Sequence, residues 1–340
     1  MMNTRKTLLA TALAGVLAAG GSVPQAGAVD GDVNAPPLAG VRILLANDDS
    51  VQAARPDGAD GRGLYELRKS LCRAGADVVV VGPWGQQSGR SRASAAAAQV
   101  TVAPPADMPD EYAADCSTAP SRGVVLGVCQ GAESCEPASA SVTPADAVDL
   151  ALGTLLADRV GWSGGPDLVL SGINSGANTD LSVNLSGTVG AATAALEHGA
   201  PAIAVSAGTR ATSVPSVDTY RTVATYATGL VERVLAGGVS RHLVRDQVLL
   251  NVNGPDVVPG VEPEPRWTDV GGVALDRFSY RKSGADTYQL AYGAVEPAPR
   301  LSPNSDTAAL ARGYISVSAV SADRGRPGKS RELERVIAGR

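Results

Sequence analysis

The stretch Val41-Arg-Ile-Leu-Leu-Ala-Asn-Asp-Asp49 decides the fold, because it leads from a short apolar run straight into two adjacent aspartates. Similar apolar runs follow along the chain, at 77–81, 167–170, 202–205 and 248–252. Segments with helical spacing separate them, at 64–74, 144–157, 189–197 and 217–235. Apolar strands that alternate with helices are typical of a parallel sheet with helices on both faces. The sequence therefore predicts an α/β fold with a Rossmann-like, mostly parallel sheet.

The C-terminal part has a different pattern, in which polar and apolar residues alternate, as in Thr287-Tyr-Gln-Leu-Ala-Tyr292. This pattern predicts an antiparallel β extension. We expect a flexible leader over 29–40, an α/β domain over 41–260, the extension over 261–323 and a charged tail over 324–340. Residues 84–142 are mostly polar, rich in Ala and Pro, and give no clear assignment.

The first 28 residues have the three parts of a secretory signal peptide. Arg5 and Lys6 supply the positive start, residues 7–19 are apolar, and Ala26-Gly27-Ala28 provides a cleavage site. We therefore expect a secreted or periplasmic protein that is cleaved near Ala28. No cysteine lies between the apolar part and the end of the cleavage region at residue 30, so no lipid anchor is expected. No later stretch is long and apolar enough to span a bilayer.

The chain has 340 residues, of which 44% are hydrophobic and 19% charged, as is usual for one large globular domain. Loss of Arg5 and Lys6 with the signal peptide would change the net charge from −5 to about −7. An acidic chain without a basic run is a poor partner for duplex nucleic acid. A small phosphorylated substrate is still compatible, because one bound cation reverses the field inside a pocket.

Four cysteines, Cys72, Cys116, Cys129 and Cys135, allow three pairings, and export predicts at least one disulfide. The last three fall in a segment that reads as loop, whereas Cys72 falls in a predicted helix. The chain has only two histidines and no paired C-x-x-C, so a zinc site is not expected.

Oxygen-bearing side chains follow the predicted strands at the points where these strands end. They include Asp48 and Asp49 after the first strand, Ser88 after the second, and Asn174 and Asn178 after the third. The carboxyl ends of parallel strands share one edge of a sheet, where ligands bind. Two carboxylates with neutral oxygens suit Mg²⁺, Mn²⁺ or Ca²⁺ better than zinc or copper. The alternative is that Asp48 and Asp49 only form a turn.

Ser186-Gly187-Thr188 opens the helical segment 189–197. The amides of such a turn and the positive end of the helix dipole predict a phosphate cradle. The alternative is an ordinary Ser N-cap. If the amides alone bind phosphate, Thr188→Ala should cost little, whereas Gly187→Val should crowd the anion and leave the metal in place.

With these residues in place the chain resembles the SurE family, the stationary-phase survival nucleotidases. The resemblance covers roughly 41–323 and includes, besides the opening stretch, Gln87-Ser-Gly89, Thr143-Pro-Ala-Asp146, Ser171-Gly-Ile-Asn174, Ser186-Gly-Thr-Val-Gly-Ala-Ala192, Leu250-Asn-Val-Asn253 and Gly313-Tyr-Ile-Ser-Val-Ser318.

This resemblance implies a phosphomonoesterase that hydrolyses nucleoside 5′- and 3′-monophosphates with Mn²⁺ or Mg²⁺, for which Ca²⁺ can substitute in a crystal. It implies Asp48, Asp49, Ser88 and Asn174 as metal ligands, with Asp48 and Asp49 as the catalytic pair. It also implies a homodimer or tetramer in which the β extension contacts a partner.

We expect the substrate to contact Asn47, Asn178 and the turn Ser186-Gly187-Thr188. The chain departs from the family pattern at Ser50, where glycine is usual, and at Gln87, where arginine is usual, and its loop over 50–63 is long. Two alternatives are an exported protein that binds phosphate esters or divalent metal without turnover, and a structural protein that calcium stabilises.

Overall fold

The computed structural model describes residues 35–53, 60–209, 214–258 and 260–323. The predicted signal peptide over 1–28 and the charged tail over 324–340 lie outside these ranges, so both stay predictions. No described helix is long and apolar enough to cross a membrane.

A nine-stranded sheet forms the centre of the fold, in the order β3-β4-β2-β1-β5-β6-β7-β11-β8. Its six central strands are all parallel to one another. They are β4 (Val125–Gln130), β2 (Asp77–Pro83), β1 (Arg42–Ala46), β5 (Leu168–Ser175), β6 (Ala202–Ala207) and β7 (Val248–Gly254). The five strands predicted from the apolar runs are β1, β2, β5, β6 and β7, which confirms the mostly parallel α/β fold.

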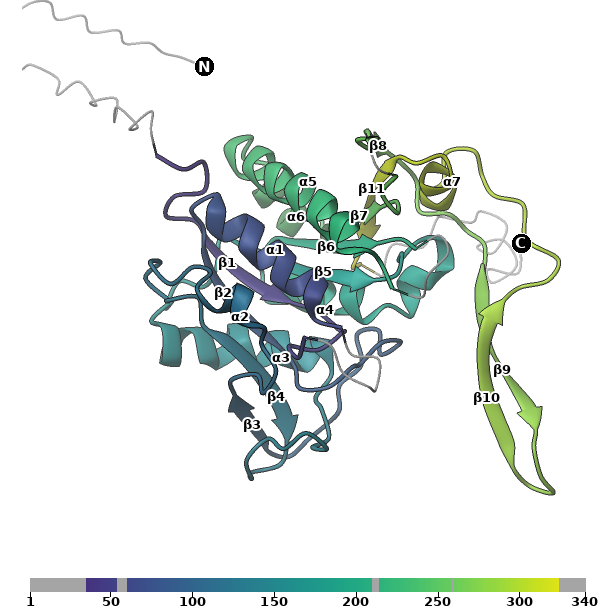
Figure 1. Cartoon of the computed structure of the whole chain (residues 1–340), viewed down its shortest axis with the longest axis horizontal. Coiled ribbons are helices and arrows are strands. Elements are labelled where there is room, and N and C mark those ends of the chain that lie inside the picture. Colours follow the sequence, from purple (N-terminus) through teal and green to yellow (C-terminus); the bar gives the residue numbers. More distant parts are fainter. Residues whose placement is uncertain (1–34, 54–59, 210–213, 259, 324–340) are drawn as a thin grey trace, which may run out of the picture. The chain divides into compact units, whose positions relative to one another are not determined.

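Helices cover both faces of this sheet, as Figure 1 shows. The helices α1 (Arg62–Arg73) and α5 (Val217–Ala236) pack on one face, and α3 (Pro144–Leu150) and α4 (Gly187–Glu197) on the other. Successive side chains of a strand point to opposite faces. Ile43 and Leu45 therefore join the core under α1 and α5, while Leu44 and Ala46 join the core under α3 and α4.

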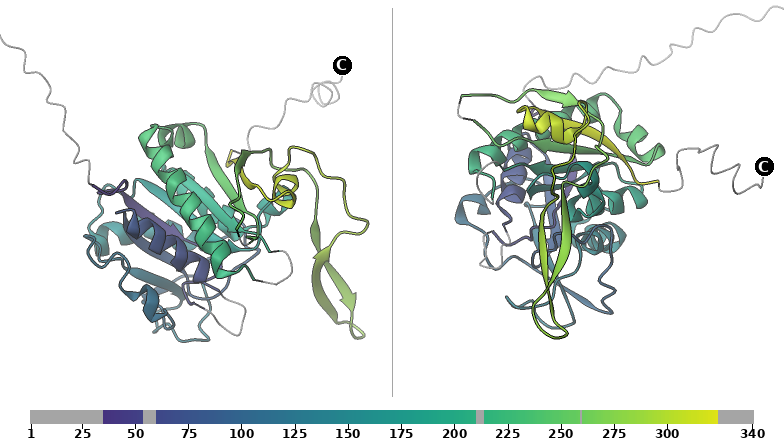
Figure 2. Two further views of the ribbon diagram at one scale, coloured as in Figure 1. Left: turned by 45° about the horizontal axis from the view of Figure 1, so that its top comes forward. Right: turned by 90° about the vertical axis from the view of Figure 1, so that its right-hand side faces the viewer.

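The C-terminal part divides between the main sheet and a separate ribbon. The strands β11 (Ile315–Ser321) and β8 (Pro265–Trp267) extend the main sheet beyond β7, and β11 is antiparallel to β7. By contrast, β9 (Asp276–Lys282) and β10 (Tyr288–Ala294) pair only with each other, as an antiparallel ribbon that is visible in Figure 2. The antiparallel extension is thus confirmed. Within residues 261–323, its separate sheet consists of β9 and β10. Two short helices complete this half, α6 (Ser240–Arg245) and α7 (Asp306–Ala311).

The segment 84–142, which the sequence left unassigned, contains β3 (Val100–Ala103), α2 (Asp110–Ala113) and β4. Cys129 lies in β4, so its assignment to a loop was wrong. Disulfides join Cys72 to Cys116 and Cys129 to Cys135, which confirms the prediction of at least one.

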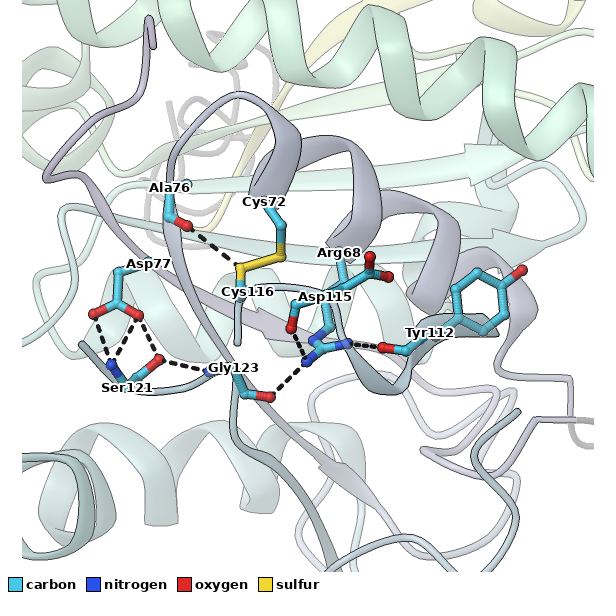
Figure 3. Close-up of a disulfide and its surroundings, with 9 residues drawn as sticks. All are labelled: Arg68, Cys72, Ala76, Asp77, Tyr112, Asp115, Cys116, Ser121 and Gly123. Atoms are coloured by element: carbon cyan, nitrogen blue, oxygen red, sulfur yellow. Dashed lines mark hydrogen bonds between the residues drawn. A yellow bond between two sulfur atoms is a disulfide. The ribbon is translucent and has the colours of Figure 1, made fainter. Parts of the chain in front are cut away.

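The first disulfide fastens this segment to α1, and a buried arginine supports it from the same helix (Figure 3). Arg68 is 1% exposed and donates hydrogen bonds to the carbonyls of Tyr112, Asp115 and Gly123 at 2.8, 2.7 and 2.7 Å. Charged groups that are buried in this way need such partners. The segment is therefore held by its backbone carbonyls as well as by the covalent bond.

Candidate active site at the switch point of the sheet

The order of the strands places a crevice between β1 and β5. From β1 the chain proceeds to β2, β3 and β4 on one side, and then crosses to β5, β6 and β7 on the other. The carboxyl ends of strands at such a switch point are where ligands bind in open α/β sheets. Asp48 and Asp49 follow β1 at this point, and Asn174 and Asn178 lie at and after the end of β5. The residues predicted from the strand ends therefore share one rim of the sheet.

Asp48 is 2% exposed and is held by the first turn of α4. The hydroxyl of Thr188 donates a hydrogen bond to its Oδ1 at 2.6 Å. Burial raises the pKa of Asp48, while hydrogen bonds from the Thr188 hydroxyl and from the backbone amides of Thr188 and Gly187 act in the opposite direction. These bonds fix the carboxylate in one orientation and stabilise its charged form.

Asp49 is held from the other side of the crevice, by β5. The backbone amide of Ser175 donates to its Oδ2 at 2.7 Å. Burial, and then the neighbouring charge of Asp48, raise the pKa of Asp49 well above its usual value. Two adjacent buried carboxylates remain charged together only if a cation compensates them. Arg62 does not serve this purpose, because its guanidinium pairs with Asp60 at 2.9 Å.

The loop between β1 and Gln52 is shaped by Asn47 and Ser50. Asn47 is fully buried, and its side-chain amide donates to the carbonyl of Ser50 at 3.1 Å. In this structure its visible role is to shape the loop, and its contact with substrate stays a prediction. Ser50 adopts φ 87°, a left-handed conformation that favours glycine. Its hydroxyl compensates by donating to the carbonyl of Trp84 at 2.7 Å and accepting from the amide of Gln52 at 3.0 Å.

Ser88 lies on the loop after β2 and is exposed. The amide of the preceding residue, Gln87, donates to the backbone carbonyl of Asp48 at 2.7 Å, which brings the loop to the aspartates. Farther along, the amide of Ala95 donates to Asp146 Oδ2 at 2.7 Å. Asp146 belongs to the capping box that starts α3 at Thr143, the N-cap expected from the sequence. The loop that carries Ser88 is therefore fastened at both ends.

The two asparagines after β5 have different surroundings. Asn174 uses its side-chain nitrogen to donate to the carbonyl of Gly176 at 2.7 Å, so its amide oxygen is the atom that can serve as a ligand. Asn178 is 7% exposed, and its side-chain nitrogen donates to Ser206 Oγ at 2.9 Å and lies 3.4 Å from Thr188 Oγ1. It therefore links α4 to the end of β6.

The end of the fifth predicted strand, Asn251-Val-Asn253, lies on the same rim, but its contacts with Asn178 were not predicted. Asn251 and Asn253 on β7 both donate to its backbone carbonyl, at 2.8 and 3.1 Å, and Asn253 Oδ1 accepts from its backbone amide at 2.7 Å. Their spacing of two on one strand was the signal for a shared contact, because alternate residues of a strand point to the same side.

The turn Ser186-Gly187-Thr188 contacts Asp48 as well as capping a helix. Ser186 Oγ accepts from the amide of Val189 at 3.1 Å, which confirms the N-cap reading. A Cβ at Gly187 would lie 2.8 Å from the Cβ of Asp48. The expectation that Gly187→Val leaves the metal ligands in place is therefore wrong, since a side chain there displaces Asp48. The expectation that Thr188→Ala costs little is also revised, because the Thr188 hydroxyl holds the same carboxylate.

The donor set fits a hard divalent cation. Among the described residues no three His, Cys, Asp or Glu side chains gather to hold a metal ion. A cation at this rim would therefore need the oxygens of Ser88 and Asn174 besides the carboxylates of Asp48 and Asp49. A set made of oxygens suits Mg²⁺ or Mn²⁺.

Comparison with known proteins gives the family of this chain. The family profile described as "Survival protein SurE" matches residues 43–277. A "5'-nucleotidase SurE" of Solidesulfovibrio magneticus is 34% identical over 281 residues, which cover 82% of this chain and 90% of that protein. Another, of Paramagnetospirillum magneticum, is 32% identical and is matched over 85% of this chain and 94% of its own length. The crystal structure of the SurE protein of Aquifex aeolicus superposes with a TM-score of 0.61 at 25% identity, and covers 87% of this chain and 99% of that one. This chain belongs to the SurE family.

Proposed function

We propose that this chain is a metal-dependent phosphomonoesterase that hydrolyses nucleoside 5′-monophosphates, and also 3′-monophosphates, to nucleoside and phosphate. The observation that carries the proposal is the carboxylate pair at the switch point. One oxygen of Asp48 is held by Thr188 and one oxygen of Asp49 by Ser175. The relatives named 5'-nucleotidase, which match most of the chain, support the same activity.

The cation that this function requires is Mn²⁺ or Mg²⁺, held by Asp48, Asp49, Ser88 and Asn174. When bound, such a cation stabilises negative charge on a phosphate oxygen and lowers the pKa of a water molecule beside it. The chain supplies the rest. One of the two aspartates, or a group that contacts them, orients the attacking water, and the first turn of α4 directs the positive end of its dipole towards the phosphate.

Thr188 and Asn178 connect the carboxylate of Asp48 with the phosphate-binding turn. Thr188 fixes Asp48 through its hydroxyl, and Asn178 lies against that hydroxyl at 3.4 Å while its backbone is held by β7. Movement of the phosphate-binding turn would therefore disturb the carboxylate, and the network keeps both in one geometry. Rigid placement of this kind is what catalysis by positioning and electrostatics requires.

The test compares Asp48→Asn and Asp49→Asn with Asp286→Asn, an equal change of charge at the exposed end of the β9–β10 ribbon. We expect both site variants to lose more than tenfold in kcat/KM on adenosine 5′-monophosphate and p-nitrophenyl phosphate in Mn²⁺, about 1.4 kcal/mol or more of barrier. Their melting temperatures should stay near that of Asp286→Asn. A wild-type chain that binds Mn²⁺ and nucleotide but releases no phosphate would instead be a binding protein.

We also propose that the protein is exported and that it forms a homodimer or tetramer. Export after cleavage near Ala28 is supported by the two disulfides, which persist in oxidising compartments. A homodimer or tetramer is supported by the β9–β10 ribbon, where Tyr280, Tyr288 and Leu290 are 69%, 59% and 52% exposed. Exposed aromatic side chains that gather on one ribbon are typical of protein contacts.

A further inference from the structure

A cavity of about 630 Å³ lies on the same rim of the sheet as the carboxylates. Ala177 after β5, Gly208 after β6, Pro255 after β7 and Thr307 on α7 are among the residues that line it. Neighbouring strands lie about 4.8 Å apart, so β7 is about 10 Å from β5 along the rim. A group attached to a phosphate held at β1 and β5 would extend over this cavity.

The cavity is joined to the metal-binding loop by two aromatic side chains. Tyr292 lines the cavity and packs on Phe278 with ring centroids 4.9 Å apart. A Cβ at Gly89, the residue after Ser88, would lie 3.9 Å from Phe278 Cζ. Tyr292 and Phe278 are directly opposite in the β9–β10 pairing and so lie on one face of the ribbon. Tyr292 therefore lines the cavity, and Phe278 beside it lies near the loop that carries Ser88.

The charged side chains that line the cavity are two carboxylates. Asp256 and Asp276 both line it, and Leu275 and Leu310 add apolar surface. Carboxylates accept hydrogen bonds from hydroxyl and amino groups, and they repel a second phosphate. An aromatic ring offers a face on which a planar base can stack. Together these features match the sugar and base of a nucleoside.

We propose that this cavity binds the nucleoside part of the substrate, and that Asp256 and Asp276 exclude leaving groups with further phosphates. The proposal rests on the proposed function and names the site that selects its substrates. It explains why the phosphate chemistry and the choice of leaving group are carried by different parts of the chain. Residues of β1, β5 and α4 carry the phosphate chemistry. Residues at the ends of β6 and β7, on α7 and on the ribbon select the leaving group.

One test fills the cavity without removing any contact. Ala311 is an exposed residue at the end of α7 that lines the cavity, and Ala236 is an exposed alanine at the end of α5 that does not. We expect Ala311→Trp to lower kcat/KM for adenosine 5′-monophosphate at least tenfold and to leave glycerol 2-phosphate, whose leaving group is too short to reach the cavity, nearly unchanged. Ala236→Trp should change neither.

A second test measures how the two carboxylates of the cavity affect the choice of substrate. In Asp276→Asn, and more so in Asp256→Asn with Asp276→Asn, the preference for adenosine 5′-monophosphate over adenosine 3′,5′-bisphosphate should fall several-fold. Asp286→Asn, on the same ribbon but outside the cavity, should keep it. Equal losses on both substrates, or an unchanged preference in the double variant, would overturn the nucleoside site.

The two proposals fail in different ways. If the wild-type chain hydrolyses neither adenosine 5′-monophosphate nor glycerol 2-phosphate in Mn²⁺, the phosphomonoesterase activity itself is refuted. Adenosine alone gives a readout that does not need turnover, since it should bind the wild-type chain and bind Ala311→Trp at least tenfold more weakly. Equal binding of adenosine to both would refute the cavity as its site.

Discussion

Single residues at the rim set the geometry of the carboxylates, and the side chain of Thr188 donates a hydrogen bond to Asp48. We expect Thr188→Ala to lower kcat/KM about tenfold or more, because Asp48 loses the hydrogen bond that orients it. Thr188→Ser keeps a hydroxyl and should retain most of the activity. Steady-state kinetics and Mn²⁺ affinity of the two variants check this. Equal activity of Ala and Ser variants would mean that Asp48 does not depend on this bond.

Ser50 gives a prediction about stability, since it combines a left-handed backbone with two side-chain hydrogen bonds. Ser50→Ala keeps the unfavourable φ and removes both bonds, so the free energy of unfolding should fall by about 1–2 kcal/mol. Ser50→Gly loses the same bonds but relieves the unfavourable backbone conformation. Its free energy of unfolding should therefore fall less than that of Ser50→Ala. Urea unfolding of both variants decides the order, and a more stable Ala variant would contradict it.

The two disulfides join whole elements of the fold, and the different lengths of the loops that they close predict unequal effects on stability. Cys72–Cys116 closes a separation of 44 residues and Cys129–Cys135 one of 6. Loop-closure entropy then predicts that the first disulfide stabilises the folded chain by about 4 kcal/mol and the second by about 2 kcal/mol. Replacing both cysteines of the first pair with Ala should therefore lower the melting temperature more than the same change in the second pair. The reverse order would show that the entropy of the unfolded chain is not the main contribution.

Elements with a strong local pattern were predictable, and those without one were not. β1, β2 and β5 are buried along nearly their whole length, so their sequences read as apolar runs. β3 has four residues, none fully buried, and it borders the sheet, so its sequence carries little signal. β11 was predicted as part of the extension because its pairing with β7 depends on tertiary contacts and not on its own pattern.

At the scale of the site, the strand-end rule correctly placed Asp48, Asp49 and Asn174 on one rim of the sheet, because each lies at or just after the end of a recognisable strand. The partners that hold them were hidden, since Thr188 is 140 residues from Asp48 and Ser175 is 126 residues from Asp49. Local sequence patterns do not report contacts at such separations. The hydrogen bonds between Asn178 and the two asparagines of β7 were not predicted for the same reason.

For the whole molecule, we predict an oligomer that depends on the distal half of the ribbon. Tyr280→Lys combined with Leu290→Lys places two charges on exposed, directly opposed positions. Light scattering after size exclusion should show a dimer or tetramer for wild type and smaller species for this variant. Arg281→Lys, on the same strand, is the control and should assemble as wild type does. A monomeric wild-type chain would contradict the prediction.

Export is tested on the protein made with its full sequence. We expect the mature chain to start at Val29, as N-terminal sequencing would show, and to contain no free thiol before reduction, because all four cysteines are paired. Retention of Arg5 and Lys6 in the protein recovered outside the cytoplasm would contradict cleavage at Ala28.

If a divalent cation on Asp48, Asp49, Ser88 and Asn174 makes this chain a phosphomonoesterase, phosphate release must depend on that cation, and a metal titration measures this dependence. The full chain is stripped with EDTA, and phosphate release from adenosine 5′-monophosphate is followed while Mn²⁺, Mg²⁺ or Zn²⁺ is added back. We predict no activity after stripping and recovery with Mn²⁺ or Mg²⁺, since hard oxygen donors suit these ions. Full activity in EDTA, or recovery with Zn²⁺ alone, would contradict the account.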